Sequence, residues 1–189
     1  KLIAARRVRG KIQDVQRVFR AGLLFGLIAG GLMTLFLLFG ADWITVHIFN
    51  SPNSALPLKV MAPTILVFSV MGVVRGYFQG LGNMVPTSIS QVIEQVVNAI
   101  ISVAASFAFM HWFANRETPA AYGAAGGTLG TLSGALAAFV FLALLMFVYR
   151  RQNAKALHRP QADRLDSWNH VYTALFLTLT PIILSQFVY

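Results

Sequence analysis

The sequence has 189 residues, of which 57% are hydrophobic and 11% are charged, with a formal net charge of +9. Soluble domains carry about 25% charged residues, so this composition excludes an ordinary soluble globular protein, and it is too apolar for a disordered chain. The sequence contains no cysteine, which excludes disulfides, a thiol nucleophile and cysteine-based metal sites.

Five apolar runs are long enough to cross a bilayer. A membrane-spanning helix needs about 20 mostly apolar residues, whereas the strands of a membrane barrel alternate over about 10 residues. The runs are continuously apolar and cover residues 21–41, 58–80, 85–113, 121–149 and 168–189. We therefore expect an all-α integral membrane protein with about five transmembrane helices.

The basic residues are distributed unevenly between these runs. Residues 1–20 contain seven Lys or Arg and residues 150–168 contain five, whereas two other loops carry only Lys59 and Arg116. Five crossings place the basic clusters on one side, which the positive-inside rule assigns to the cytoplasm. We favour this topological interpretation over binding to nucleic acid or to a specific anionic lipid.

Small and kinking residues suggest how the helices pack. Because lipid tails are as apolar as leucine, membrane helices associate where small side chains let two backbones approach closely. Proline inside a helix removes a backbone hydrogen-bond donor and favours a kink, and transporters use broken helices of this kind. Pro63 lies within the second apolar run and Pro181 within the fifth. Glycine recurs at four-residue spacing, and we expect helix packing at Gly22, Gly26, Gly30, Gly126, Gly130 and Gly134.

The third run carries a polar stripe. Side chains three or four residues apart share a helix face, and the stripe consists of Ser88, Gln91, Gln95, Asn98 and Ser102. Burying so many polar groups against lipid would be costly, so the stripe must face other helices or water, and it favours a hydrophilic cavity.

Glu94 and Arg75 are the charged residues nearest this stripe. A carboxylate at this depth in a membrane is a functional candidate. We weigh two roles for Glu94 equally. In a cavity it could bind a cation or proton, or pair with Arg75. Alternatively, it could form a purely structural polar bridge between helices. Arg75 either extends to the headgroups or faces an anionic phosphate. The candidate substrate or cavity residues are Arg75, Gln79, Asn83, Ser88, Gln91, Glu94, Gln95 and Asn98.

An enzyme is disfavoured by the sequence. It contains no paired intramembrane carboxylates and no Walker A motif, and its four histidines show no metal-site spacing. We expect no metal and no cofactor, with a coupling cation or the membrane potential driving any transport.

The segment from Met61 to Asn98 resembles a known family. It contains Arg-Gly-Tyr-Phe-Gln-Gly at 75–80, then Pro-Thr at 86–87 and Gln-Val-Ile-Glu-Gln at 91–95. These motifs resemble the polysaccharide-transporter branch of the MOP flippase superfamily. That branch includes the stage V sporulation protein B group and the MurJ-like lipid II flippases.

The resemblance implies a MATE/MOP-type helical bundle of about fourteen helices in two lobes around a central cavity. The chain, interpreted as an internal piece of a longer protein, would supply the third to seventh helices. It would divide into a cytoplasmic basic segment (1–20), four helices of the N-terminal lobe (21–149), a cytoplasmic basic inter-lobe loop (150–168) and the start of the C-terminal lobe (169–189).

The function that the resemblance implies is translocation of lipid-linked oligosaccharide across the bacterial cytoplasmic membrane by alternating access, with lipid II as the favoured substrate. The alternatives are a flippase for capsule, exopolysaccharide or teichoic units, a cation-coupled drug exporter, a non-transporting scaffold for cell-wall synthesis, and a membrane-embedded transferase. The expected partners are the lipid-linked oligosaccharide, membrane lipids and the remainder of the chain, with no nucleic acid.

Overall fold

The computed structural model describes residues 1–115, 118–153 and 167–188. Within these ranges all secondary structure is helical. The elements are α1 (Leu2–Val8), α2 (Ile12–His47), the short 3-10 helix η1 (Pro52–Ser54), α3 (Ala55–Gly80), α4 (Val85–Trp112), α5 (Pro119–Gln152) and α7 (Trp168–Val188). The all-α prediction is thereby confirmed.

Four stretches among the described residues are long and apolar enough to cross a membrane: Ile12–His47, Pro52–Gly80, Val85–Trp112 and Pro119–Gln152. They contain the first four apolar runs of the sequence, apart from residue 113 at the end of the third run. The fifth run forms α7, but several of its side chains lie outside the described residues, so its span stays a prediction.

The helix α2 extends well beyond the apolar run at 21–41. It contains 36 residues and is about 54 Å long at about 1.5 Å per residue, whereas the hydrocarbon core of a bilayer is about 30 Å thick. The basic segment 1–20 is therefore itself largely helical, as α1 and the first turns of α2. Pro63 lies inside α3, which continues past it to Gly80.

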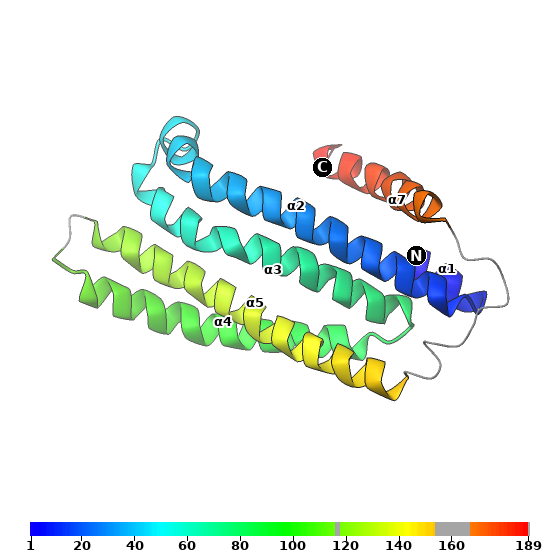
Figure 1. The fold of residues 1–189 in the computed structure, drawn as a ribbon. Coiled ribbons are helices and arrows are strands. Elements are labelled where there is room, and N and C mark those ends of the chain that lie inside the picture. Colours follow the sequence, from blue (N-terminus) through cyan, green and yellow to red (C-terminus); the bar gives the residue numbers. More distant parts are fainter. Residues whose placement is uncertain (116–117, 154–166, 189) are drawn as a thin grey trace.

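The long helices lie side by side and roughly aligned, with α1 at one end (Figure 1). Helix α3 packs on α2 and α5, and α4 packs mainly on α5. Although α3 and α4 are joined by a short turn, they have little direct contact with each other. Any interaction between their side chains therefore bridges two helices that are otherwise held together by the turn and by α5.

A small core joins α2, α3 and α5, whereas many large apolar side chains point outward. The core includes Phe19, Met71 and Leu142, of which Met71 and Leu142 are fully buried. By contrast, Phe39 is 85% exposed and Phe107 is 77% exposed. Soluble monomers rarely expose such extensive apolar surface, so these side chains are placed as expected for a bundle surrounded by lipid.

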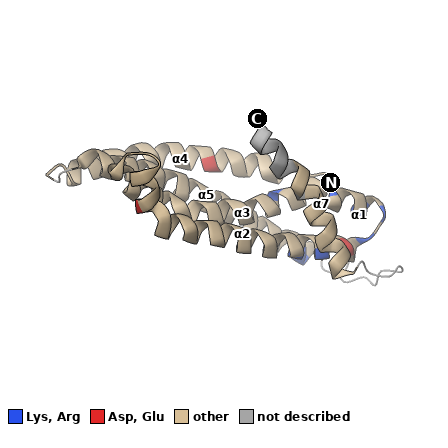
Figure 2. Ribbon diagram, turned by 90° about the horizontal axis from the view of Figure 1, so that it is seen from above, with Lys and Arg blue, Asp and Glu red and all other residues tan. Residues whose placement is uncertain are grey.

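Helix α7 lies against the first half of α2. Val171 is fully buried beside Val18 and Ala21. The guanidinium of Arg17 lies 5.4 Å from the centre of the Trp168 ring. These contacts place the start of α7 at the same end of the bundle as α1, where Figure 2 shows Lys and Arg concentrated.

Candidate functional site

The structure places the glycines of both repeats at close approaches between helices. In α2, a methyl group on Gly26 would lie 3.2 Å from the carbonyl oxygen of Ser69 in α3, and one on Gly30 would collide with the Ser69 side chain. On Gly22 it would lie 3.2 Å from Val73. The Ser69 hydroxyl donates a hydrogen bond of 2.9 Å to the carbonyl of Gly26. The glycine face of α2 therefore contacts α3.

The second repeat brings α5 against α4 more tightly. A methyl group on Gly126 would lie 2.5 Å from the carbonyl oxygen of Ala105, and one on Gly134 would lie 2.5 Å from that of Glu94. Gly130 faces Ser102, whose hydroxyl donates a 2.8 Å hydrogen bond to the carbonyl of Gly127. Only glycine allows this approach of the two backbones, since any Cβ would overlap backbone atoms of α4.

Arg75 and Glu94 form an ion pair between α3 and α4. The Nη2 atom of Arg75 lies 2.7 Å from Oε2 of Glu94, and the two side chains are only 15% and 13% exposed. Arg75 lies five residues before the end of α3 and Glu94 nine residues after the start of α4. These positions are about 8 Å and 14 Å along the helix axes from the turn. The pair therefore joins the two helices within their spans.

Ser90 completes this cluster. Its hydroxyl oxygen accepts a 3.0 Å hydrogen bond from Nε of Arg75, and the hydroxyl donates a 2.7 Å hydrogen bond to the carbonyl of Thr87. Ser90 is fully buried, so the guanidinium is held by both a hydroxyl and a carboxylate. Such charge-assisted hydrogen bonds fix the geometry of the guanidinium.

Ser90 is a residue that the sequence analysis did not select. It precedes Glu94 by four residues, which places both side chains on one side of α4. The polar stripe through Ser88, Gln91 and Gln95 is centred on the adjoining part of the helix surface, with Gln91 one turn before Glu94. The signal in the sequence that could have identified Ser90 is its position four residues before Glu94, the single acid of the third apolar run.

The polar stripe itself does not form one surface. Asn98 lies at the interface with α5, where its Oδ1 accepts a 3.4 Å hydrogen bond from the hydroxyl of Thr131 and lies 2.8 Å from Oγ of Ser102. By contrast, Gln91 and Gln95 are exposed. Helix α5 covers the part of the stripe that contains Asn98 and Ser102 and leaves Gln91 and Gln95 uncovered, and a cavity-lining role for the stripe stays a prediction.

The other candidate residues near the turn are exposed. Gln79 projects from the last turn of α3, and Ser88 from the first turn of α4, where its hydroxyl donates a 3.2 Å hydrogen bond to the carbonyl of Met84. Asn83 accepts a 3.1 Å hydrogen bond from the backbone N–H of Val85 at the start of α4. Like Gln91 and Gln95, they are exposed, uncharged hydrogen-bonding groups in the same part of the chain as the ion pair.

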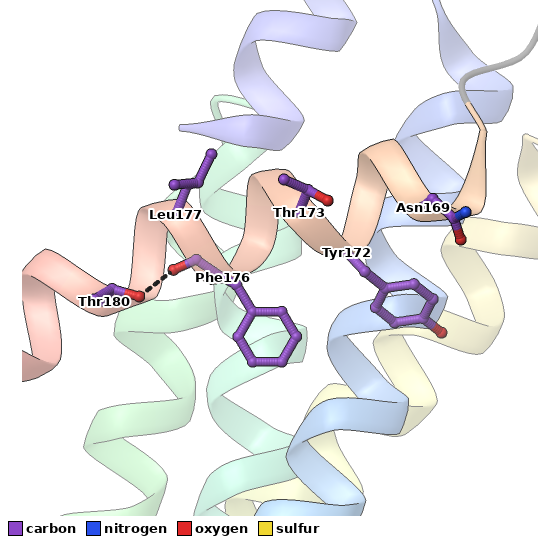
Figure 3. A pocket seen from close by; sticks show the side chains of 6 residues that line it. All are labelled: Asn169, Tyr172, Thr173, Phe176, Leu177 and Thr180. Atoms are coloured by element: carbon purple, nitrogen blue, oxygen red, sulfur yellow. Dashed lines mark hydrogen bonds between the residues drawn. The ribbon is translucent and has the colours of Figure 1, made fainter.

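A separate hollow of about 420 Å³ lies along α7 (Figure 3). Its described lining comes from α7 alone, namely Asn169, Tyr172, Thr173, Phe176, Leu177 and Thr180. These residues recur at helical spacing along one face and carry no charge. The described lining is therefore one uncharged face of α7.

The apolar exterior and the four candidate spans define a helical, multi-pass membrane protein. Residues 2–185 match the family described as "Polysaccharide biosynthesis protein", and the chain belongs to this family. The resemblance to the MOP flippase superfamily is confirmed.

Curated relatives from Bacillus subtilis (strain 168) agree with this assignment. "Stage V sporulation protein B" is 27% identical over 188 residues, which cover 100% of this chain and 35% of that protein. "Lipid II flippase MurJ" is 26% identical over 187 residues, covering 95% of this chain and 33% of that protein. The "Uncharacterized membrane protein YabM" is 29% identical over 136 residues, covering 72% and 25% respectively.

The chain thus spans about a third or less of the length of these relatives. No solved structure matches it significantly. The comparisons support a multi-pass membrane protein of a bacterial flippase family.

Proposed function

We propose that the full-length protein is a flippase that moves a lipid-linked oligosaccharide across the bacterial cytoplasmic membrane by alternating access, with lipid II as the favoured substrate. Family membership supports the reaction class. The observation that carries the proposal to this chain is the largely buried Arg75–Glu94 pair, with exposed uncharged polar side chains on the same two helices of an apolar bundle. Charged groups inside a membrane are rare and mark transport pathways.

The exposed polar side chains suit the head of such a substrate. Gln79, Gln91 and Gln95 offer amide donors and acceptors, which match the hydroxyl groups of sugars. Arg75 is the nearby cation for a phosphate, but its guanidinium is already held by Glu94 and Ser90. A phosphate would therefore have to compete with the Glu94 carboxylate, so substrate binding would be coupled to the link between α3 and α4.

The ion pair also suits a mechanical role. Alternating access in such transporters is largely a rocking of rigid groups of helices. Because α3 and α4 have few other mutual contacts, the Arg75–Glu94–Ser90 cluster holds them in a fixed relative position. We infer that residue 1 lies on the cytoplasmic side and that a coupling cation or the membrane potential drives the cycle.

The experiment uses the full-length protein in cells depleted of their own lipid II flippase. Precursor exposed on the outer face is measured with the protein confirmed in the membrane. Restored exposure would support lipid II as the substrate. No exposure would contradict it and favour capsule, exopolysaccharide or teichoic units, or drug export, which increased drug resistance would reveal. A non-transporting scaffold would restore no exposure, and its support of cell-wall synthesis would be unchanged after the polar stripe is replaced by apolar residues of similar size.

A further inference from the structure

A partly enclosed hollow of about 290 Å³ lies at the end of the bundle that carries α1. It is formed where the α1–α2 turn meets the ends of α3 and α5. Its polar lining residues are Arg7, Tyr77, Tyr149 and Asn153, and its apolar ones include Val15 and Leu81. Its volume is at the lower end of the range for small-molecule sites, about 300 to 1,000 Å³.

Basic residues outnumber acidic ones around this hollow, where the acid that adjoins the lining is Asp14, fully buried in α2 next to Val15. Arg7 lies among the lining residues, and its Nη1 atom would be 3.3 Å from a methyl group placed on Gly82, so the guanidinium reaches the α3–α4 turn. Arg150 and Arg151 lie in the last turn of α5, next to the lining residue Tyr149. None of the described lining residues is acidic. An anion is therefore the ligand that the electrostatics favour.

The two tyrosines are hydrogen-bonded to each other through their side chains, which leaves one phenol O–H of the pair as a neutral donor. Their ring centroids lie 6.2 Å apart in an edge-to-face arrangement, and Tyr77 is 4% exposed. Phenol hydroxyls beside a guanidinium are suited to phosphate oxygens, which accept several hydrogen bonds at once. Val15 and Leu81 meanwhile provide an apolar wall. A ligand with both a phosphate and an apolar part would satisfy both kinds of lining.

The position of the hollow fits the headgroup level of a bilayer. Helix α2 is longer than the hydrocarbon core is thick, and the hollow touches its first turn, at Ile12 and Val15. Tyrosine is enriched at membrane interfaces, and basic pockets between transmembrane helices bind anionic lipid headgroups. The positive-inside rule accounts for basic residues at this end of the bundle but not for a hollow among them, and the hollow therefore favours binding of a headgroup.

We propose that this hollow binds the phosphate diester of an anionic phospholipid and so ties the α1–α2 turn to the ends of α3 and α5. A free phosphate ion has the same chemistry and would use the same donors. The assignment does not depend on the substrate that the protein transports.

The test measures equilibrium binding of a phosphatidylglycerol with a fluorescent acyl chain to the full-length protein in a zwitterionic detergent. Arg7→Gln should weaken binding about tenfold, the loss of one charge-assisted hydrogen bond. Arg9→Gln is the matched control, because Arg9 is an exposed cation of the same segment that does not line the hollow. Its effect should be less than about twofold, as expected for a screened surface charge.

Two further arms identify the source of the phosphate. Phosphatidylcholine carries the same phosphate diester but also a choline cation, which the surrounding arginines repel, so it should bind much more weakly. Displacement of phosphatidylglycerol by millimolar inorganic phosphate would overturn the lipid assignment in favour of the free ion. Equal weakening by Arg7→Gln and Arg9→Gln, or equal binding of the two lipids without displacement by phosphate, would overturn the proposal. If Arg7→Gln does not purify in folded form, Tyr149→Phe replaces it, with a weakening of several-fold expected and an unchanged affinity contradicting the site.

Discussion

The guanidinium of Arg75 in α3 donates a 2.7 Å hydrogen bond to the carboxylate of Glu94 in α4, and both side chains are largely buried. Lys59 and Asp42 also form an ion pair of 2.7 Å, but their side chains are 39% and 68% exposed. The same pair length thus occurs in two different environments. The buried pair carries the larger energetic consequence, because its charges have lost more of their solvation.

Breaking the buried pair should destabilise the protein more than breaking the exposed one. Arg75→Met leaves Glu94 as an uncompensated buried charge, and we expect a loss of about 3 kcal/mol in the free energy of unfolding. Lys59→Met should cost less than about 1 kcal/mol. The measurement is unfolding of the full-length protein in mixed micelles titrated with a denaturing detergent. The double variant Arg75→Met/Glu94→Leu should recover most of the loss, and equal losses in the two single variants would contradict this account.

Ser90 should contribute to stability, whereas Ser88 should not. Ser90→Ala removes the hydroxyl that accepts from Nε of Arg75, so we expect a loss of about 1 kcal/mol in the same unfolding measurement. Ser88→Ala is the matched control, because Ser88 is exposed and bonds only to the carbonyl of its own helix at Met84. Indistinguishable stabilities of the two variants would mean that Ser90 does not position the guanidinium.

The contact between α4 and α5 should tolerate no side chain at Gly126. Gly126→Ala places a methyl group 2.5 Å from the carbonyl oxygen of Ala105, and the resulting overpacking should cost about 1 to 3 kcal/mol. At Gly31 nothing lies within 4 Å of such a methyl group. Gly31→Ala should therefore be neutral, or stabilising by up to about 1 kcal/mol, through helix propensity. A thermal-melting comparison in which both variants behave alike would argue against this packing.

The topology can be tested by cysteine labelling, because these 189 residues contain no cysteine and any cysteine elsewhere in the full-length protein is first replaced by serine. Cysteines introduced singly at Arg9 and at Asn53 occupy exposed positions at opposite ends of α2. In intact cells a membrane-impermeant maleimide should label Asn53→Cys and should label Arg9→Cys only after permeabilisation. The reverse labelling pattern would place the basic end outside.

Much of the fold could be predicted from the sequence because the relevant signals are local. Continuous apolar runs determine the helices, and the four-residue spacing of Gly126, Gly130 and Gly134 defines the face that α5 presents to α4. The extension of α2 back to Ile12 was not visible in the same way. Hydropathy detects the part of a helix that crosses lipid, not the turns that continue beyond it.

The candidate site was only partly predictable. Pairing of Glu94 with Arg75 was one of several alternatives, since spacing along the chain does not show which side of α4 meets α3. Periodicity placed Asn98 on the same face as Gln95, but α5 covers only one of them, which depends on how the helices pack. The hollow beside Arg7 is formed where the α1–α2 turn meets the ends of α2, α3 and α5. Local sequence patterns do not predict which helix ends meet in the fold.

The most direct test of the proposed function is the amount of lipid II precursor exposed outside flippase-depleted cells that express the full-length protein. Glu94→Gln is compared with Asp42→Asn, which removes a carboxylate from the exposed pair, at equal levels in the membrane. We predict that the unchanged protein and Asp42→Asn restore exposure and that Glu94→Gln lowers it about tenfold or more, since the link between α3 and α4 is weakened. Equal exposure with Glu94→Gln and Asp42→Asn would contradict the role assigned to the Arg75–Glu94 pair.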